Sequence, residues 1–143
     1  MIVLKWPFYL FIPSGRFFIM VHKYAKGYRS ERELVHTLSD MGYMVVRTPR
    51  SGRINLASPD IIAAKNGVLI VIECKSRAEA FTVPQDQLAE LKEWEVKAGA
   101  RAYIGWKISH KGWFFLRLAD VAGNKGNIGK KFVSENAISI NEI

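Results

Sequence analysis

The sequence contains one cysteine and three scattered histidines, which are too few and too widely spaced to form a zinc site or a disulfide framework. It has no C-x-x-C pair, and no glycine-rich phosphate loop follows an expected strand. The spacing of these residues supports neither a catalytic cysteine nor a Ser-His pair. Zinc modules, thiol catalysis and nucleotide hydrolysis are therefore not expected, and Cys74 is interpreted as a buried core thiol.

Acidic residues are also scarce. Only 13 Asp and Glu oppose 21 Lys and Arg, which gives a net charge of +8 and suggests a polyanionic partner. No acid lies between Asp40 and Asp60. That stretch instead carries arginines at three-residue intervals around Ser51, namely Arg47, Arg50 and Arg53. A phosphate bound by this loop would be delivered towards Asp60, although a solvated basic loop gives the same pattern.

Long uninterrupted apolar runs are missing as well. The first 20 residues, MIVLKWPFYLFIPSGRFFIM, are apolar and aromatic but are broken by Lys5, Pro7, Pro13 and Arg16. They fall short of the ~20 apolar residues of a membrane span, and they show no signal-peptide cleavage site. We expect residues 1–20 to be an extension, arising from an upstream start codon or forming a mobile arm, in preference to a membrane anchor. Residues 21–143 are expected to form one domain in the cytoplasm.

Residues 59–76, PDIIAAKNGVLIVIECKS, read as two apolar strands joined by a tight turn. Asn66-Gly67 is the strongest short-range signal for a two-residue hairpin loop, because both positions require positive φ. If these residues form the loop, Asp60 stands directly across from Glu73, with Cβ atoms about 5 Å apart. Lys75 follows Glu73 by two residues and therefore shares its face of the sheet. The pattern predicts a patch of two carboxylates and one amine.

Two like charges facing each other on an apolar hairpin repel, and burial raises the cost. A divalent cation would offset the repulsion, since Mg²⁺ binds through one or two carboxylates together with water and phosphate oxygens. A salt bridge between Lys75 and one acid at the end of the sheet would also offset it in part. The register of the strands alone leaves both interpretations open.

The segment SERELVHTLSDMGY predicts an amphipathic helix, because Leu34, Val35, Leu38 and Met41 recur at helical spacing. Ser30 and Glu33 match a capping box, and Gly42 is placed to end the helix. Glu31 falls on the apolar stripe and is expected to face inward. An ordinary solvated acid in the first helical turn, favoured by the helix dipole, is the alternative.

The expected order of elements indicates an α/β fold with a central mixed sheet flanked by helices, because the hairpin is antiparallel. We expect helices at 24–41 and 84–98 and strands at 43–48, 60–65, 68–76, 101–108, 112–118 and near 131–134. The glycine-rich GNKGNIGKK is expected to be a loop. Its lysines, Lys125, Lys130 and Lys131, are interpreted either as contacts to a DNA arm or as an aid to solubility.

Pro59-Asp60, followed after twelve residues by Glu73-Cys74-Lys75, resembles the PD-(D/E)xK nuclease motif. The ordered set of KGYRSERELVHTLSDMGYMVVRTPRSG at 26–52, this hairpin, and VPQDQLAELKEW at 83–94 is similar to the archaeal Holliday junction resolvase family of the Hjc type. The similarity extends over roughly residues 22–120. The bare motif occurs by chance, whereas the ordered set is much more specific.

This resemblance implies a restriction-endonuclease-like core, and a homodimer that nicks four-way DNA junctions symmetrically by metal-dependent phosphodiester hydrolysis. It assigns catalysis to Glu31, Asp60, Glu73 and Lys75. Mg²⁺, or Mn²⁺ in its place, would be held by Asp60, Glu73, Glu31 and the Cys74 carbonyl. DNA contacts are assigned to Lys26, Arg32, Arg47, Arg50, Ser51 and Arg53, and a further role to Gln87. The alternatives are another PD-(D/E)xK nuclease, of restriction or repair type, and a non-catalytic DNA-binding protein.

Overall fold

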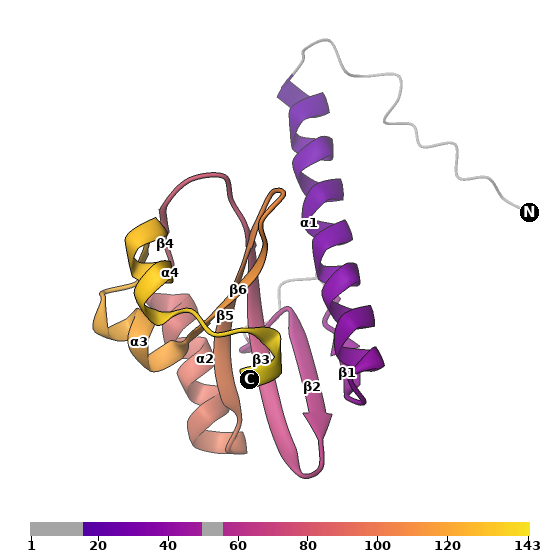
Figure 1. Cartoon of the computed structure of the whole chain (residues 1–143), viewed down its shortest axis with the longest axis vertical. Coiled ribbons are helices and arrows are strands. Elements are labelled where there is room, and N and C mark those ends of the chain that lie inside the picture. Colours follow the sequence, from indigo (N-terminus) through magenta and orange to yellow (C-terminus); the bar gives the residue numbers. More distant parts are fainter. Residues whose placement is uncertain (1–15, 50–55) are drawn as a thin grey trace, which may run out of the picture.

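The computed structural model describes residues 16–49 and 56–143, and it is built around a five-stranded mixed sheet of order β1-β2-β3-β5-β6 (Figure 1). The strands are β1 (Met44–Arg47), β2 (Ile61–Lys65), β3 (Val68–Ser76), β5 (Arg101–Ile108) and β6 (Gly112–Arg117). Neighbouring strands run antiparallel except for β3 and β5, which are parallel. The expected α/β architecture with a mixed sheet is therefore confirmed.

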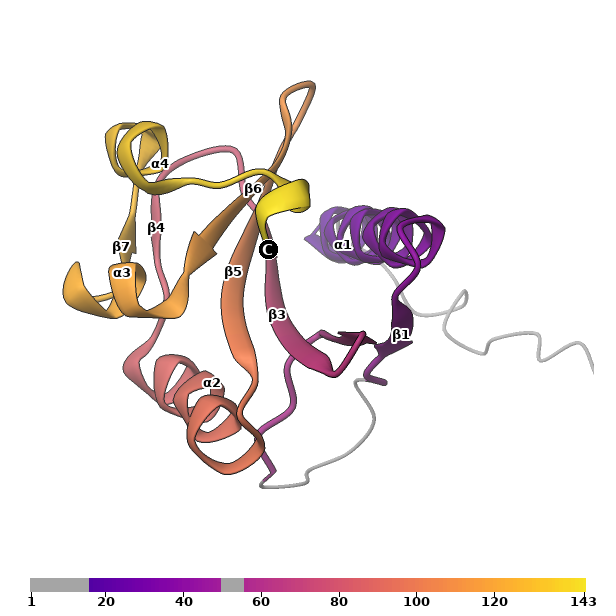
Figure 2. The same ribbon diagram turned by 60° about the horizontal axis from the view of Figure 1, so that its bottom comes forward.

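The two long helices cover opposite faces of this sheet. Helix α1 (Arg16–Asp40) packs beside β1, β2 and β3, and α2 (Gln85–Ala98) packs on the other face against β3 and β5 (Figure 2). Helix α2 is positioned by the crossover between the parallel strands β3 and β5. No helix within the described ranges is long and apolar enough to cross a membrane.

The sheet separates two hydrophobic cores whose members alternate along the hairpin strands. Ile61, Ile70 and Ile72 pack under α1 with Leu34 and Leu38. The alternate residues of the same strands point the other way: Val71, Ile62 and Leu69 pack on the α2 side. This alternation is the one expected for a hairpin buried on both faces. Cys74 is buried on the α1 side, as predicted for a core thiol.

The first helix begins earlier than predicted. Helix α1 starts at Arg16 and not at residue 24, so Ser30 lies inside the helix and the predicted capping box is wrong. Gly27 did not stop the helix, because a single glycine in a helix interior costs only about 1 kcal/mol. The helix end was predicted correctly: α1 ends at Asp40, and Gly42 adopts a φ of 91°.

The C-terminal part also differs from the prediction. A strand was expected near residues 131–134, but these residues belong to helix α4 (Lys130–Asn136). The expected glycine-rich loop contains strand β7 (Asn127–Ile128), which pairs with β4 (Phe81–Thr82), and it follows helix α3 (Leu118–Gly123). A 3-10 helix, η2 (Ile140–Glu142), ends the chain. Phe132 and Val133 are too short an apolar run to distinguish a strand from a helix by periodicity.

Candidate active site

The hairpin between β2 and β3 has the predicted turn and the predicted register. Asn66 and Gly67 have φ values of 50° and 76°, as a two-residue loop of this type requires. Paired positions run outward from Lys65 and Val68 to Ile61 and Ile72. One further step places Asp60 opposite Glu73. The local turn therefore fixes the position of the two carboxylates.

Asp60 and Glu73 form a largely buried acidic pair. Asp60 is 5% exposed, and its Oδ2 accepts a hydrogen bond of 2.8 Å from the backbone N–H of Cys74. Burial raises the pKa of Glu73 to about 7, and the negative charge of Asp60 adds to the effect. Lys75 acts in the opposite direction but does not restore the ordinary value of 4.5. The pair thus retains an unfavourable charge interaction that a further positive group would relieve.

Lys75 is held between the acidic pair and helix α2. Its Nζ lies 3.4 Å from Oε1 of Glu73 and donates a hydrogen bond of 2.8 Å to Oε1 of Gln87. The side chain of Lys75 is only 13% exposed. The structure therefore places Gln87 beside the amine that the sequence motif assigns to catalysis.

Glu31 is buried and faces inward from α1, as its place on the apolar stripe predicted. It lies in the middle of α1, so the helix dipole does not stabilise it and the first-turn interpretation is wrong. Its counterion is Arg47, whose Nε donates to Oε2 of Glu31 at 2.7 Å. The ring of Tyr28 lies 4.5 Å from Cζ of the same guanidinium. Tyr28 was missed in the sequence, where its only signal was its position three residues before Glu31.

The Glu31–Arg47 pair and the acidic pair are connected through the backbone. Arg47 pairs with Ile61, the residue after Asp60. The N–H of Thr48 donates to the carbonyl oxygen of Asp60 at 3.0 Å, and its Oγ1 donates to the carbonyl of Pro59 at 2.5 Å. Both pairs therefore lie at one end of β2, where the chain enters the sheet.

The residues present fit a divalent cation held by a small number of oxygen ligands. Two buried carboxylates face each other, and Lys75 offsets only part of their repulsion. Carboxylate oxygens with water and phosphate are the ligands that Mg²⁺ prefers, so two carboxylates are sufficient. Within the described part of the chain, however, no group of three or more His, Cys, Asp and Glu side chains is arranged to hold a metal ion.

Several predicted DNA-binding residues fall on parts of the chain that the structure does not describe. Arg50, Ser51, Arg53 and the side chain of Lys26 lie outside the described residues. Arg32 is exposed on α1, next to Glu31.

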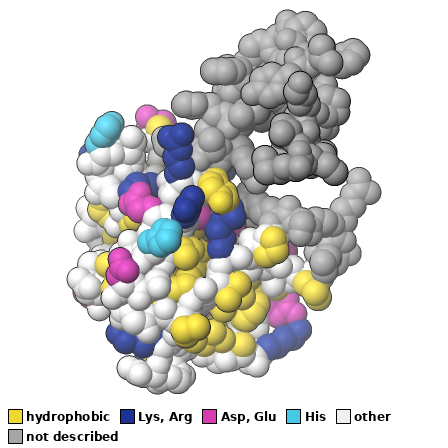
Figure 3. Space-filling model, turned by 90° about the vertical axis from the view of Figure 1, so that its right-hand side faces the viewer, with side chains coloured by type: hydrophobic (Ala, Val, Ile, Leu, Met, Phe, Trp, Pro, Cys, Tyr) yellow, Lys and Arg dark blue, Asp and Glu magenta, His cyan; other side chains and the backbone are white. Residues whose placement is uncertain are grey.

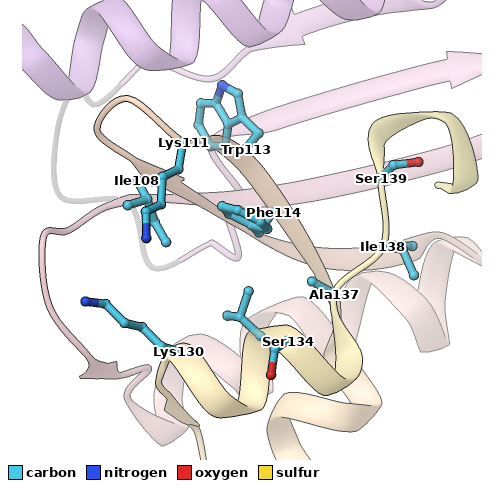
Figure 4. Close-up of a pocket in the computed structure, with 10 residues that line it drawn as sticks. Ile108, Lys111, Trp113, Phe114, Lys130, Ser134, Ala137, Ile138 and Ser139 are labelled. Atoms are coloured by element: carbon cyan, nitrogen blue, oxygen red, sulfur yellow. The ribbon is translucent and has the colours of Figure 1, made fainter.

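A separate pocket of about 490 Å³ lies between the β5–β6 hairpin and α4 (Figure 4). Lys111 and Lys130 extend to its mouth, and Phe114 and Ala137 line it. It contains none of the acidic residues described above. That Lys130 contacts a DNA arm therefore stays a prediction. Lys111 lines the same pocket as Lys130.

Known proteins share this fold and this sequence pattern. A sequence model of the archaeal Holliday junction resolvase (Hjc) family matches residues 22–143. The chain is 40% identical over 106 residues to the crossover junction endodeoxyribonuclease Hjc of Sulfolobus acidocaldarius, which covers 69% of this chain and 73% of the relative. It is 33% identical over 93 residues to Hjc of Archaeoglobus fulgidus, covering 64% and 68%.

The solved structure of the Archaeoglobus fulgidus Hjc, a Holliday junction resolvase from an archaeal hyperthermophile, is similar with a TM-score of 0.73. The two sequences are 26% identical, and the match covers 81% of this chain and 98% of the Archaeoglobus fulgidus chain. The family match spans most of the sequence and includes the hairpin that carries the acidic pair. This chain belongs to the archaeal Holliday junction resolvase (Hjc) family.

Proposed function

We propose that this chain is a structure-selective endonuclease that resolves four-way DNA junctions by paired, symmetric nicks. The observation that carries the proposal is the buried cluster of Asp60, Glu73 and Lys75, in which a lysine and two carboxylates meet on one hairpin. Membership of the family, and relatives named crossover junction endodeoxyribonucleases, support the substrate. A non-catalytic DNA-binding protein would have no need of this cluster.

In the proposed mechanism, Asp60, Glu73 and the backbone carbonyl of Cys74 hold Mg²⁺, which Mn²⁺ can replace, and Glu31 contributes from α1. When bound, the cation lowers the pKa of its water and offsets the charge of the phosphate. Lys75 orients the attacking water or takes a proton from it, and Gln87 keeps the amine in place. Arg47 and Arg32 bind phosphates that flank the cleaved bond.

We further propose a C₂ homodimer in the cytoplasm. A four-way junction that is nicked symmetrically in two strands requires two active sites related by a two-fold axis, and each chain carries one acidic cluster. Recognition of the junction then depends on the shape and backbone charge of the DNA, which suits a chain with a net charge of +8.

The test uses the purified chain with a labelled four-way junction, a flap and a duplex of matched sequence, with and without Mg²⁺. We expect paired nicks in the junction only when the metal is present. Preferential cutting of the flap or the duplex would indicate a different nuclease of the same superfamily.

Asp60→Asn is the matched variant for this assay, because the amide oxygen still accepts the hydrogen bond from Cys74 while the charge is lost. We expect it to bind the junction and to nick it at least a hundredfold more slowly. Nicking at the parental rate would contradict the assignment of the site.

A further inference from the structure

Arg47 is held at a fixed place at the end of the sheet where Asp60 also lies. Its backbone pairs with Ile61 at the end of the edge strand β1, and the next residue, Thr48, donates its N–H to the carbonyl of Asp60 at 3.0 Å. The side chain of Arg47 is 27% exposed, so it is accessible to a ligand although it is partly packed. A guanidinium at this position can meet a phosphate that approaches Asp60.

Two side chains of α1 contact this guanidinium from different directions. Glu31 accepts a hydrogen bond from Nε at 2.7 Å, and the ring of Tyr28 lies 4.5 Å from Cζ. Tyr28 and Glu31 are three residues apart on a helix and therefore share one side of it. Helix α1 therefore contacts the Arg47 guanidinium through both side chains.

The two contacts restrain different motions. A carboxylate accepts hydrogen bonds in the plane of a guanidinium and restrains rotation within that plane, whereas an aromatic ring against the guanidinium carbon restrains its movement out of position. The guanidinium has five N–H donors, and one carboxylate accepts at most two of them in a bidentate pair. At least three N–H donors of Arg47 therefore remain for ligands other than Glu31.

We propose that Tyr28 is a positioning residue for Arg47: its ring holds the guanidinium in the plane in which the remaining donors meet a DNA phosphate next to the acidic pair. This inference rests on the proposed function, because it takes Arg47 to be a phosphate ligand. Without the ring, Arg47 has more freedom to lose when DNA binds, so affinity falls. A cation–π contact at a partly exposed site corresponds to a factor of about two to five in affinity.

The experiment measures DNA binding by Tyr28→Leu, which removes the ring but keeps apolar bulk, and by Tyr28→Phe, which keeps the ring. The probes are a fluorescent four-way junction and a duplex of one arm's sequence, both in EDTA. Single-turnover nicking at saturating enzyme in Mg²⁺ is recorded in parallel. Both substitutions are repeated in an Arg47→Ala background, which closes a double-mutant cycle.

We expect Tyr28→Leu to raise Kd about two- to fivefold and to slow nicking at saturating enzyme by less than this factor. Tyr28→Phe should bind like the parent, and neither change should matter once Arg47 is absent. An unchanged Kd in Tyr28→Leu, an equal loss in the Arg47→Ala background, or a loss in Tyr28→Phe would each overturn the inference.

A second readout does not depend on DNA. The Nε–H signal of Arg47 in the NMR spectrum should be shifted to higher field by the Tyr28 ring in the parent and in Tyr28→Phe, and not in Tyr28→Leu. A signal that is unaffected by Tyr28→Leu would contradict the stacking itself.

Failure of the proposed function gives a different result. If the parent binds DNA but does not nick junctions, the function is wrong while the Kd values still decide the role of Tyr28. If the parent binds no DNA at all, both proposals are wrong.

Discussion

Folding changes the protonation of Glu73 in the proposed site. Its pKa is raised from 4.5 to about 7, first by burial and then by the charge of Asp60. Between these two pH values, the folded chain holds a proton that the unfolded chain has released, so the stability of the metal-free protein falls as pH rises. The contribution of protonated Glu73 to the free energy of unfolding is fully present below about pH 4.5 and is lost as the pH rises through about 7.

Glu73→Gln removes this titration. In urea unfolding with EDTA, we expect the parent to lose on the order of 2 kcal/mol more than the variant between pH 5 and pH 7.5. Adding a divalent cation should reverse the trend in the parent, because the metal favours the ionised carboxylate. Equal pH dependence of the free energy of unfolding in both proteins would show that Glu73 is not perturbed.

Gln87 provides a second prediction about a single residue. Gln87→Leu removes the acceptor that holds Nζ of Lys75, so the lysine loses one restraint near the reacting water. We expect the single-turnover nicking rate to fall about five- to tenfold, as the loss of one hydrogen bond implies, with little change in junction Kd. Gln85→Leu is the control, since Gln85 is exposed on the same helix and its side chain donates a hydrogen bond to the carbonyl of Lys125, away from Lys75. A similar fall in both variants would point to helix α2 in general.

At the scale of the elements, the tight turn of the hairpin sets the geometry of the site. Gly67 has a φ of 76° and no described atom within 4 Å of an added Cβ, so Gly67→Ala introduces backbone strain without a steric clash. We expect the free energy of unfolding to fall by about 1 kcal/mol. Gly27→Ala is the control and should have the opposite effect on stability. An added Cβ at Gly27 also meets no described atom within 4 Å, but Gly27 lies in helix α1, so the change should raise the free energy of unfolding by about 0.5–1 kcal/mol. Loss of stability in both variants would contradict this account.

How far an element could be predicted depended on how local its determinants are. The β2–β3 hairpin and its register follow from Asn66-Gly67 alone, so the opposition of Asp60 and Glu73 was readable from the sequence. The capping box at Ser30 was misread because an S-x-x-E pattern also occurs within helices. Helix α4 was misread because Phe132 and Val133 carry no periodicity.

Contacts between distant segments could not be predicted in the same way. The bond between Glu31 and Arg47 joins α1 to β1 and depends on how the helix docks on the sheet. The apolar stripe predicted that Glu31 faces inward, but it could not show which positive group would balance its charge. The stacking of Tyr28 on Arg47 depends on the same docking.

At the scale of the whole molecule, the edge of the sheet is the candidate dimer surface. Met44 and Val46 of β1 are 80% and 59% exposed, and Figure 3 shows hydrophobic side chains gathered on the side of the molecule that carries α1 and β1. Such residues offer no charge to DNA, and an apolar edge strand readily pairs with another chain. We expect a second copy of this chain to cover them.

Met44→Lys combined with Val46→Lys should weaken the proposed dimer about a hundredfold or more, because the two-fold interface would bury four charges, two from each copy, in place of apolar side chains. Sedimentation equilibrium measures the effect. Val96→Lys, on α2 and 73% exposed, is the matched control and should remain dimeric. A double variant that dimerises like the parent would place the interface elsewhere.

The parallel pairing of β3 with β5 also has a consequence for the order of folding. The acidic pair needs only a two-residue loop to form, whereas β5 joins β3 after the chain has passed through α2. Hairpins close in about 1–10 μs, and non-local pairings are slower. The two acids can therefore oppose each other before β5, which follows later in the chain, pairs with β3.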